Sequence, residues 1–113
     1  MNTPISSLRN LGPASEAAFK RAGISTAEEL RELGTDTAYA RLLQSGERPH
    51  FIGYYVIEMG LQGRPWNDCK GTEKERLRAR FDGLVAQHLN RDLAGIEKIL
   101  DDIGVRKQKG PHG

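Results

Sequence analysis

The chain has 113 residues, a size typical of one domain built around one hydrophobic core. Hydrophobic residues make up 37% and charged residues 28%, so the composition lies outside the highly charged, weakly hydrophobic range of disordered chains. The formal net charge is +2, and residues 105–113 hold three basic and no acidic side chains. The rest of the chain is therefore close to neutral, which excludes a strong overall field that would steer it to a polyanion.

The single cysteine, Cys69, excludes an intramolecular disulfide and favours a reducing, cytoplasmic setting. The N-terminal residues lack the basic cluster and apolar run of a secretory signal. The most apolar stretch, residues 51–61, contains Glu58 and two glycines and is much shorter than the roughly 20 residues of a membrane span. We expect a cytoplasmic protein without a membrane segment.

Prolines and glycines divide the first half of the chain into short helices. Proline at the first helical position loses no hydrogen bond that the helix needs, and glycine ends a helix readily. Thr26 and Glu29 have the spacing of a capping box, which starts a helix that Gly34 stops. The predicted helices of this half cover about residues 3–10, 13–22, 26–33 and 35–46.

The second half begins with a central helix, about residues 49–63, that has apolar residues on every side. Gly53 and Gly60 lie on one stripe of it, where a neighbouring segment can approach closely. A capping box at Thr72 predicts a long helix to about Leu89. Asn90 is expected to cap a last helix whose apolar residues keep a three-four spacing, namely Leu93, Ile96, Leu100 and Ile103.

These patterns predict an all-α fold, a compact bundle of five to six helices over residues 1–104. Helical spacing predominates, and no run of alternating residues indicates a strand. Residues 105–113 have no apolar pattern and are expected to form a flexible basic tail.

No constellation of residues indicates catalysis. His50, His88 and His112 lack the short spacings of a metal site, and no cofactor-binding glycine motif occurs. Cys69 has no surrounding nucleophile signature, so a partly buried thiol is favoured over a small enzyme centred on this residue. We expect a protein that is not an enzyme and has no metal or cofactor.

Four basic residues at alternate positions, Lys74, Arg76, Arg78 and Arg80, resemble a nucleic-acid patch at first sight. On a helix they separate onto two flanks of the apolar stripe, and Arg78 meets Asp82 one turn later. Side chains in such places commonly cover the edges of a core with their aliphatic parts. A solvated face is therefore favoured over a phosphate-binding groove.

The stretch from residue 8 to residue 30 resembles a helix-hairpin-helix, so the bundle is expected to be helix-hairpin-helix or SAM-like. In that motif a tight turn exposes the amides that start the second helix, which hold a DNA phosphate without reading sequence. Gly12 keeps one hairpin glycine, Asn10 stands where another is usual, and Ala14 replaces a frequent lysine. Asparagine adopts the left-handed conformation, so the turn survives. The candidate DNA-binding residues are Asn10, Gly12, Ala14 and Ser15.

The segment Lys20–Ile24 is also similar to the C-terminal domain of the RNA polymerase alpha subunit. A longer resemblance rests on a series of short motifs over roughly residues 4–85. In order, these are Leu11-Gly12-Pro13, Ala22-Gly23-Ile24, Leu33-Gly34, the apolar helix from Phe51, and Gly63-Arg64-Pro65-Trp66-Asn67. Together they resemble the C-terminal domain of the TfoX (Sxy) competence-regulator family, here as a stand-alone domain.

This resemblance implies a helical module for bacterial transcription of DNA-uptake genes, where the family acts with a cyclic-AMP-responsive activator. The leading hypothesis is a non-catalytic interaction module whose partner is a transcription activator or RNA polymerase. The alternative is weak, sequence-independent DNA binding through the residue 10–15 hairpin. Arg64 and Trp66 are the candidate protein contacts, because arginine and tryptophan are enriched in binding hot spots. Trp66 in the core is the competing interpretation and the favoured one.

Overall fold

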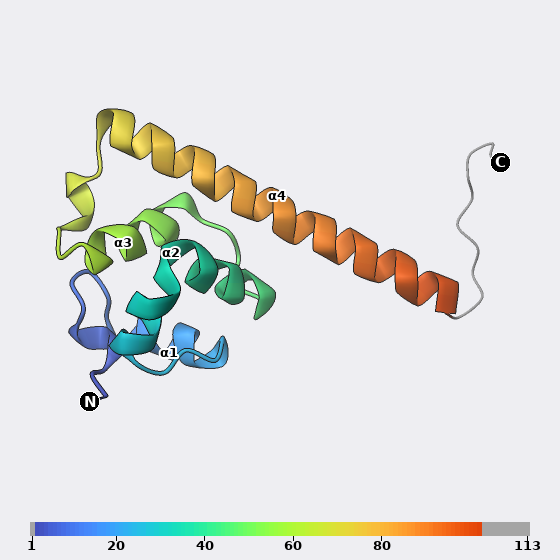
Figure 1. Ribbon diagram of the computed structural model, residues 1–113, viewed down its shortest axis with the longest axis horizontal. Helices are drawn as coiled ribbons and strands as arrows, with labels where there is room; N and C mark the ends of the chain where they lie inside the picture. The colour runs from blue at the N-terminus through green and yellow to red at the C-terminus, as the bar shows by residue number, and fades with distance from the viewer. Residues whose placement is uncertain (1, 103–113) are drawn as a thin grey trace.

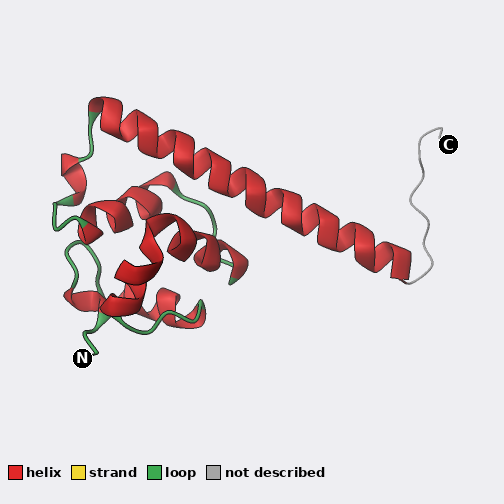
Figure 2. Ribbon diagram, in the orientation of Figure 1, coloured by secondary structure: helices red, strands yellow, loops and turns green. Residues whose placement is uncertain are grey.

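The computed structural model describes residues 2–102, with side chains placed for residues 2–91. It contains four α-helices and two short 3-10 helices (Figure 1), in the order η1 (Ile5–Ser7), α1 (Pro13–Arg21), α2 (Ala27–Gln44), α3 (Phe51–Leu61), η2 (Trp66–Asp68) and α4 (Gly71–Asp102). Figure 2 shows helices and loops and no strand over these residues. The predicted all-α class is confirmed.

The predicted number of helices is wrong, because residues 2–102 form four α-helices rather than five or six. The segments 26–33 and 35–46 join in α2, although Gly34 has φ 81° and ψ 167° and kinks the helix. The break expected at Asn90 is absent, since α4 runs on to Asp102. The expected tail, residues 105–113, lies outside the described residues.

The expected helix over residues 3–10 is also wrong. Only the 3-10 helix η1 forms there, and Asn10 follows it with φ 70°. The left-handed conformation expected for Asn10 is therefore confirmed, whereas the first α-helix of a helix-hairpin-helix is missing from this segment. The helix-hairpin-helix or SAM-like assignment is not confirmed.

Most local start and stop signals act as expected. Gly12 is the N-cap of α1 and Pro13 its first residue. Gly23 has φ 85°, and the next amide, that of Ile24, donates to the Phe19 carbonyl at 2.8 Å, which closes the end of α1. At the start of α2 both bonds of the predicted capping box are present. The fourth helix begins at Gly71, one residue before the expected cap.

The core lies between α1, α2 and α3, and α4 closes it from one side (Figure 1). Its largest fully buried side chains are Ile5, Phe19, Ile24, Leu30, Leu43, Tyr54 and Met59. Phe81 of α4 enters an aromatic cluster, with ring centroids 5.8 Å from Tyr39, 5.5 Å from Phe51 and 5.9 Å from Tyr54. This cluster fixes the first half of α4 on α2 and α3.

The two glycines of α3 have different surroundings. A Cβ at Gly60 would collide with the backbone carbonyl of Arg9, so the loop after η1 packs directly against the helix. A Cβ at Gly53 would meet nothing within 4 Å. The predicted close approach is confirmed at Gly60 and is wrong at Gly53.

Candidate functional site

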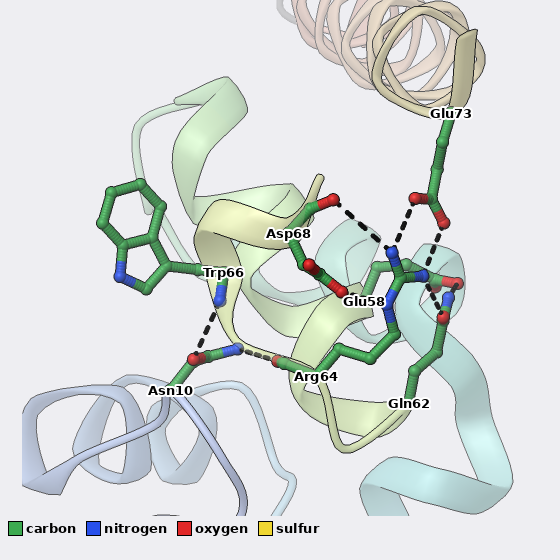
Figure 3. A network of polar contacts seen from close by, with 7 residues as sticks. All are labelled: Asn10, Glu58, Gln62, Arg64, Trp66, Asp68 and Glu73. Atoms are coloured by element: carbon green, nitrogen blue, oxygen red, sulfur yellow. Dashed lines mark hydrogen bonds and ion pairs between the residues drawn. The ribbon is translucent and has the colours of Figure 1, made fainter. Parts of the chain in front are cut away.

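Asn10 joins the loop after η1 to the turn after α3 (Figure 3). Its Nδ2 donates to the Arg64 carbonyl at 2.9 Å and more weakly to the Val56 carbonyl at 3.5 Å. Its Oδ1 accepts the backbone N–H of Trp66 at 3.1 Å. One half-buried amide therefore fixes the backbone on both sides of Pro65. The residue expected to shape a DNA-binding hairpin instead braces the Arg64–Trp66 turn.

The guanidinium of Arg64 is occupied by partners within the chain (Figure 3). It donates two bonds to Glu73 at 2.8 and 2.9 Å and one to Gln62 at 2.7 Å. It also donates to the Asp68 carboxylate at 2.9 Å and, more weakly, to the Asp68 carbonyl at 3.5 Å. Hydrogen bonds to Glu73 and then to Asp68 raise the pKa of Arg64, and the bond from Arg64 lowers the pKa of Glu73. Arg64 thus links the end of α3 to the start of α4.

Trp66 is 50% exposed, in contrast to the side chains of the core. The interpretation that Trp66 is a core residue is therefore wrong. In Figure 3 its indole points away from the polar network around Arg64. The backbone of Trp66 is held by Asn10 and by the 3-10 helix η2, which begins at Trp66. The point at which the indole is attached to the chain is therefore fixed. The structure brings Asn10, Arg64 and Trp66 together.

Ala14 and Ser15 lie apart from this turn, in the first turn of α1. Ala14 is exposed, Ser15 is half-buried, and both line an open cavity of about 290 Å³ whose walls include Phe19 and Val56. Glu16 places a carboxylate in the first turn of α1, where it accepts from the backbone N–H and hydroxyl of Ser6 at 3.2 and 3.3 Å. That negative charge opposes a phosphate at the amide end of the helix.

Cys69 follows η2 and is buried, with 4% of its surface exposed. Burial raises the pKa of the Cys69 thiol, and the charge of Glu73 raises it further. The thiol therefore stays protonated at neutral pH, and the protonated form is a poor nucleophile. Its position supports the expectation of a partly buried thiol.

The basic side chains of α4 cover the edges of the core. Arg78 lies 5.2 Å from the Phe51 ring centroid and donates to Asp82 at 3.0 Å, as the helical spacing predicts. Arg80 bonds Asp36 at 2.8 Å, and Tyr54 donates to the same carboxylate. Burial opposes the ionisation of Asp36, yet the bonds from Arg80 and Tyr54 lower its pKa overall. These contacts agree with a solvated face whose charges are partly paired.

Among the described side chains, those of residues 2–91, no three metal-binding groups gather at one place. Within residues 2–102, no helix combines the length and apolar character needed to cross a membrane.

Sequence reasoning missed the partners of Arg64 and the role of Asn10. The spacing of Arg64 and Asp68, four residues apart, was a usable local signal. Glu73 belongs to the next helix, and the acceptors of Asn10 lie 46 and 54 residues further along the chain. No local pattern points to contacts of that kind.

Residues 1–81 match the TfoX C-terminal domain. The chain belongs to this family. Asn10, Arg64, Trp66 and Phe81 lie inside the matched range, and α4 continues beyond it from residue 82. No curated protein matches the chain.

The TfoX C-terminal domain here is also similar to a solved structure, the crystal structure of an uncharacterized protein from Listeria monocytogenes. The two share 28% sequence identity with a TM-score of 0.64. The likeness covers 71% of this chain and 91% of the Listeria chain. The fold of this domain thus has a relative of known structure.

Proposed function

We propose that this TfoX C-terminal domain is a non-catalytic, cytoplasmic interaction module of a bacterial competence regulator, and that Trp66 contacts its protein partner. The observation that carries the proposal is the half-exposed indole on a backbone braced by Asn10. A rigid aromatic group loses little conformational entropy on binding and offers a large apolar face, which is why tryptophan is frequent in hot spots.

The proposed partner is RNA polymerase or a cyclic-AMP-responsive activator, because family membership points to transcription of DNA-uptake genes. Arg64 contributes by holding the turn, since its guanidinium is already bonded to Glu73 and Asp68. In this role it positions Trp66 and makes no direct contact with the partner.

Replacing Trp66 by Ala is expected to abolish binding to the partner while the domain stays folded. A half-exposed side chain should cost no more than about 2 kcal/mol of stability, less than the roughly 3–5 kcal/mol of a buried tryptophan. Thermal melting checks the fold. Biolayer interferometry with the purified polymerase and the purified activator checks the binding.

The matched control is Ile52→Ala, which truncates another large exposed side chain, 60% exposed, at the opposite end of α3. It should bind the partner like the unchanged protein. Equal binding by the Trp66 and Ile52 variants would show that the contact surface lies elsewhere.

The alternative is weak DNA binding at the start of α1, favoured by the left-handed Asn10 and the exposed Ala14. We expect weak affinity for a DNA duplex that falls steeply with salt, because the chain outside residues 105–113 is close to neutral and Glu16 opposes a phosphate. A duplex titration at several salt concentrations measures this. Tight, sequence-selective binding that persists at high salt would contradict the expectation and favour a DNA-reading surface.

A further inference from the structure

An open cavity lies between α1, α3 and the loop that joins α2 to α3. It measures about 290 Å³, and most of its lining is apolar, contributed by Leu11, Ala18, Phe19, Leu42, Val56 and Ile57. This volume is close to the lower end of small-molecule sites, roughly 300 Å³. The cavity therefore suits a ligand whose apolar body is one aromatic ring or a short branched chain.

Gly53 keeps part of this space empty. It lies in the first turn of α3 and lines the cavity, and a Cβ at this position would meet nothing within 4 Å. Ala14 and Ala18 line the cavity from α1 with one methyl group each. Glycine is less favourable than alanine inside a helix, and no neighbouring segment packs into the gap at Gly53. The gap is free to receive a ligand.

The hydroxyl of Tyr39, which also lines the cavity, is already bonded within the chain. It accepts the backbone N–H of His50 at 3.0 Å and donates to the His50 carbonyl at 3.3 Å. These two bonds fix the loop before α3, whose exposed residues Arg48 and His50 form the rim of the cavity. A polar group on a ligand would therefore meet this rim.

The charge of the rim favours an anion. No ion pair among the described side chains involves Arg48. Glu47, the acidic residue of the lining, is paired with Arg21 at 3.1 Å, and Glu16 does not line the cavity. The first turn of α3 contains no acidic residue. An unpaired arginine beside an apolar cavity is complementary to a carboxylate, which it can hold with two parallel hydrogen bonds.

We infer that this cavity binds a small organic acid, with its apolar body in the space at Gly53 and its carboxylate on Arg48. The His50 imidazole at the same rim offers a further N–H donor. A wholly apolar ligand would leave the rim unused, and a ligand with several charges would not match the apolar lining. Trp66 does not line the cavity, so this site is separate from the proposed protein contact.

Amide chemical shifts in NMR titrations with phenylacetate and isovalerate test the site. Both acids should shift the amides of the cavity lining. Phenylacetamide, which has the same ring and no charge, should bind about tenfold more weakly than phenylacetate. Arg48→Ala should weaken phenylacetate by about the same factor and leave phenylacetamide unchanged. The matched control is Arg31→Ala, which removes another exposed arginine outside the lining and should leave both affinities unchanged.

Filling the cavity tests the location. Gly53→Leu and, separately, Ala14→Leu should weaken both acids at least about tenfold by occupying the space of the apolar body. Gly83→Leu adds the same side chain on α4, where a Cβ also meets nothing within 4 Å, and should bind like the unchanged protein. Circular dichroism melts show whether each variant folds.

Three results would overturn the inference. The first is the absence of any shift with either acid at millimolar concentration. The second is binding that survives both Gly53→Leu and Ala14→Leu, which would place the acids elsewhere on the protein. The third is equal affinity for phenylacetate and phenylacetamide, which would show that Arg48 does not hold a carboxylate.

Discussion

Asn10→Ala is expected to destabilise the domain by about 2–4 kcal/mol. Part of the loss, about 1–2 kcal/mol, is the cost of a left-handed backbone for a residue with a Cβ and no polar side chain. The rest arises because the Arg64 carbonyl and the Trp66 N–H lose their partner in a half-buried place. Urea denaturation measures the free energy of unfolding directly.

Asn10→Gly separates the two contributions. Glycine adopts φ 70° without strain, so this variant loses the side-chain bonds and keeps the conformation. It avoids the roughly 1–2 kcal/mol of left-handed strain, and part of that gain is lost because glycine makes the unfolded chain more flexible. Asn10→Gly should therefore be more stable than Asn10→Ala by about 1 kcal/mol. If Asn10→Ala unfolds at the same urea concentration as the unchanged protein, the bracing role of Asn10 is wrong.

The effect of Asn10 should extend to the proposed contact. Without Asn10 Oδ1 as its acceptor, the Trp66 N–H no longer holds the backbone that carries the indole. Binding of the partner would then have to order this turn first. The stability and binding changes of the Asn10 variants should therefore run in parallel, although Asn10 itself need not touch the partner.

The sequence predicted those parts of the fold that depend on neighbouring residues. The capping box at Thr26, proline at the start of α1 and the left-handed Asn10 all concern interactions within a few residues. Such interactions are nearly the same in a peptide and in a folded domain, so their patterns can be read locally.

Contacts between distant segments decided the features that the sequence did not predict. Large apolar side chains are usually buried, which favours a core position for Trp66. The chain turns there so that Cys69 is buried while Trp66 is half-exposed. The break expected at Asn90 relied on a capping preference of about 1 kcal/mol, and an asparagine inside a helix costs less than that. Such weak preferences do not determine a helix boundary.

In the candidate site, too, the sequence points to individual residues but not to the contacts between distant segments. Sequence reasoning named Asn10, Arg64 and Trp66, but assigned Asn10 to one surface and the other two to another. Their actual grouping depends on the close packing of the Arg9–Leu11 loop against α3. That packing requires a residue without a side chain at Gly60, and among the described glycines this is the one where an added Cβ would collide with another atom.

Gly60→Ala is expected to destabilise the domain by about 1–3 kcal/mol, as overpacking in a tight interior does. Glycine to alanine inside a helix normally gains about 1 kcal/mol, so the expected sign is reversed. The reason is that the new Cβ would collide with the Arg9 carbonyl, a backbone atom in the loop that Asn10 ties to the Arg64–Trp66 turn. The loop must move away from α3 to make room.

Gly53→Ala is the matched control on the same helix, because its Cβ would meet nothing within 4 Å. It should leave stability unchanged or raise it by up to about 1 kcal/mol. The double variant Asn10→Ala with Gly60→Ala should lose less than the sum of the two single losses, because both changes loosen the same loop. Equal unfolding free energies for Gly60→Ala and Gly53→Ala would show that the loop adjusts without cost, and strictly additive losses would show that Asn10 and Gly60 act on separate contacts.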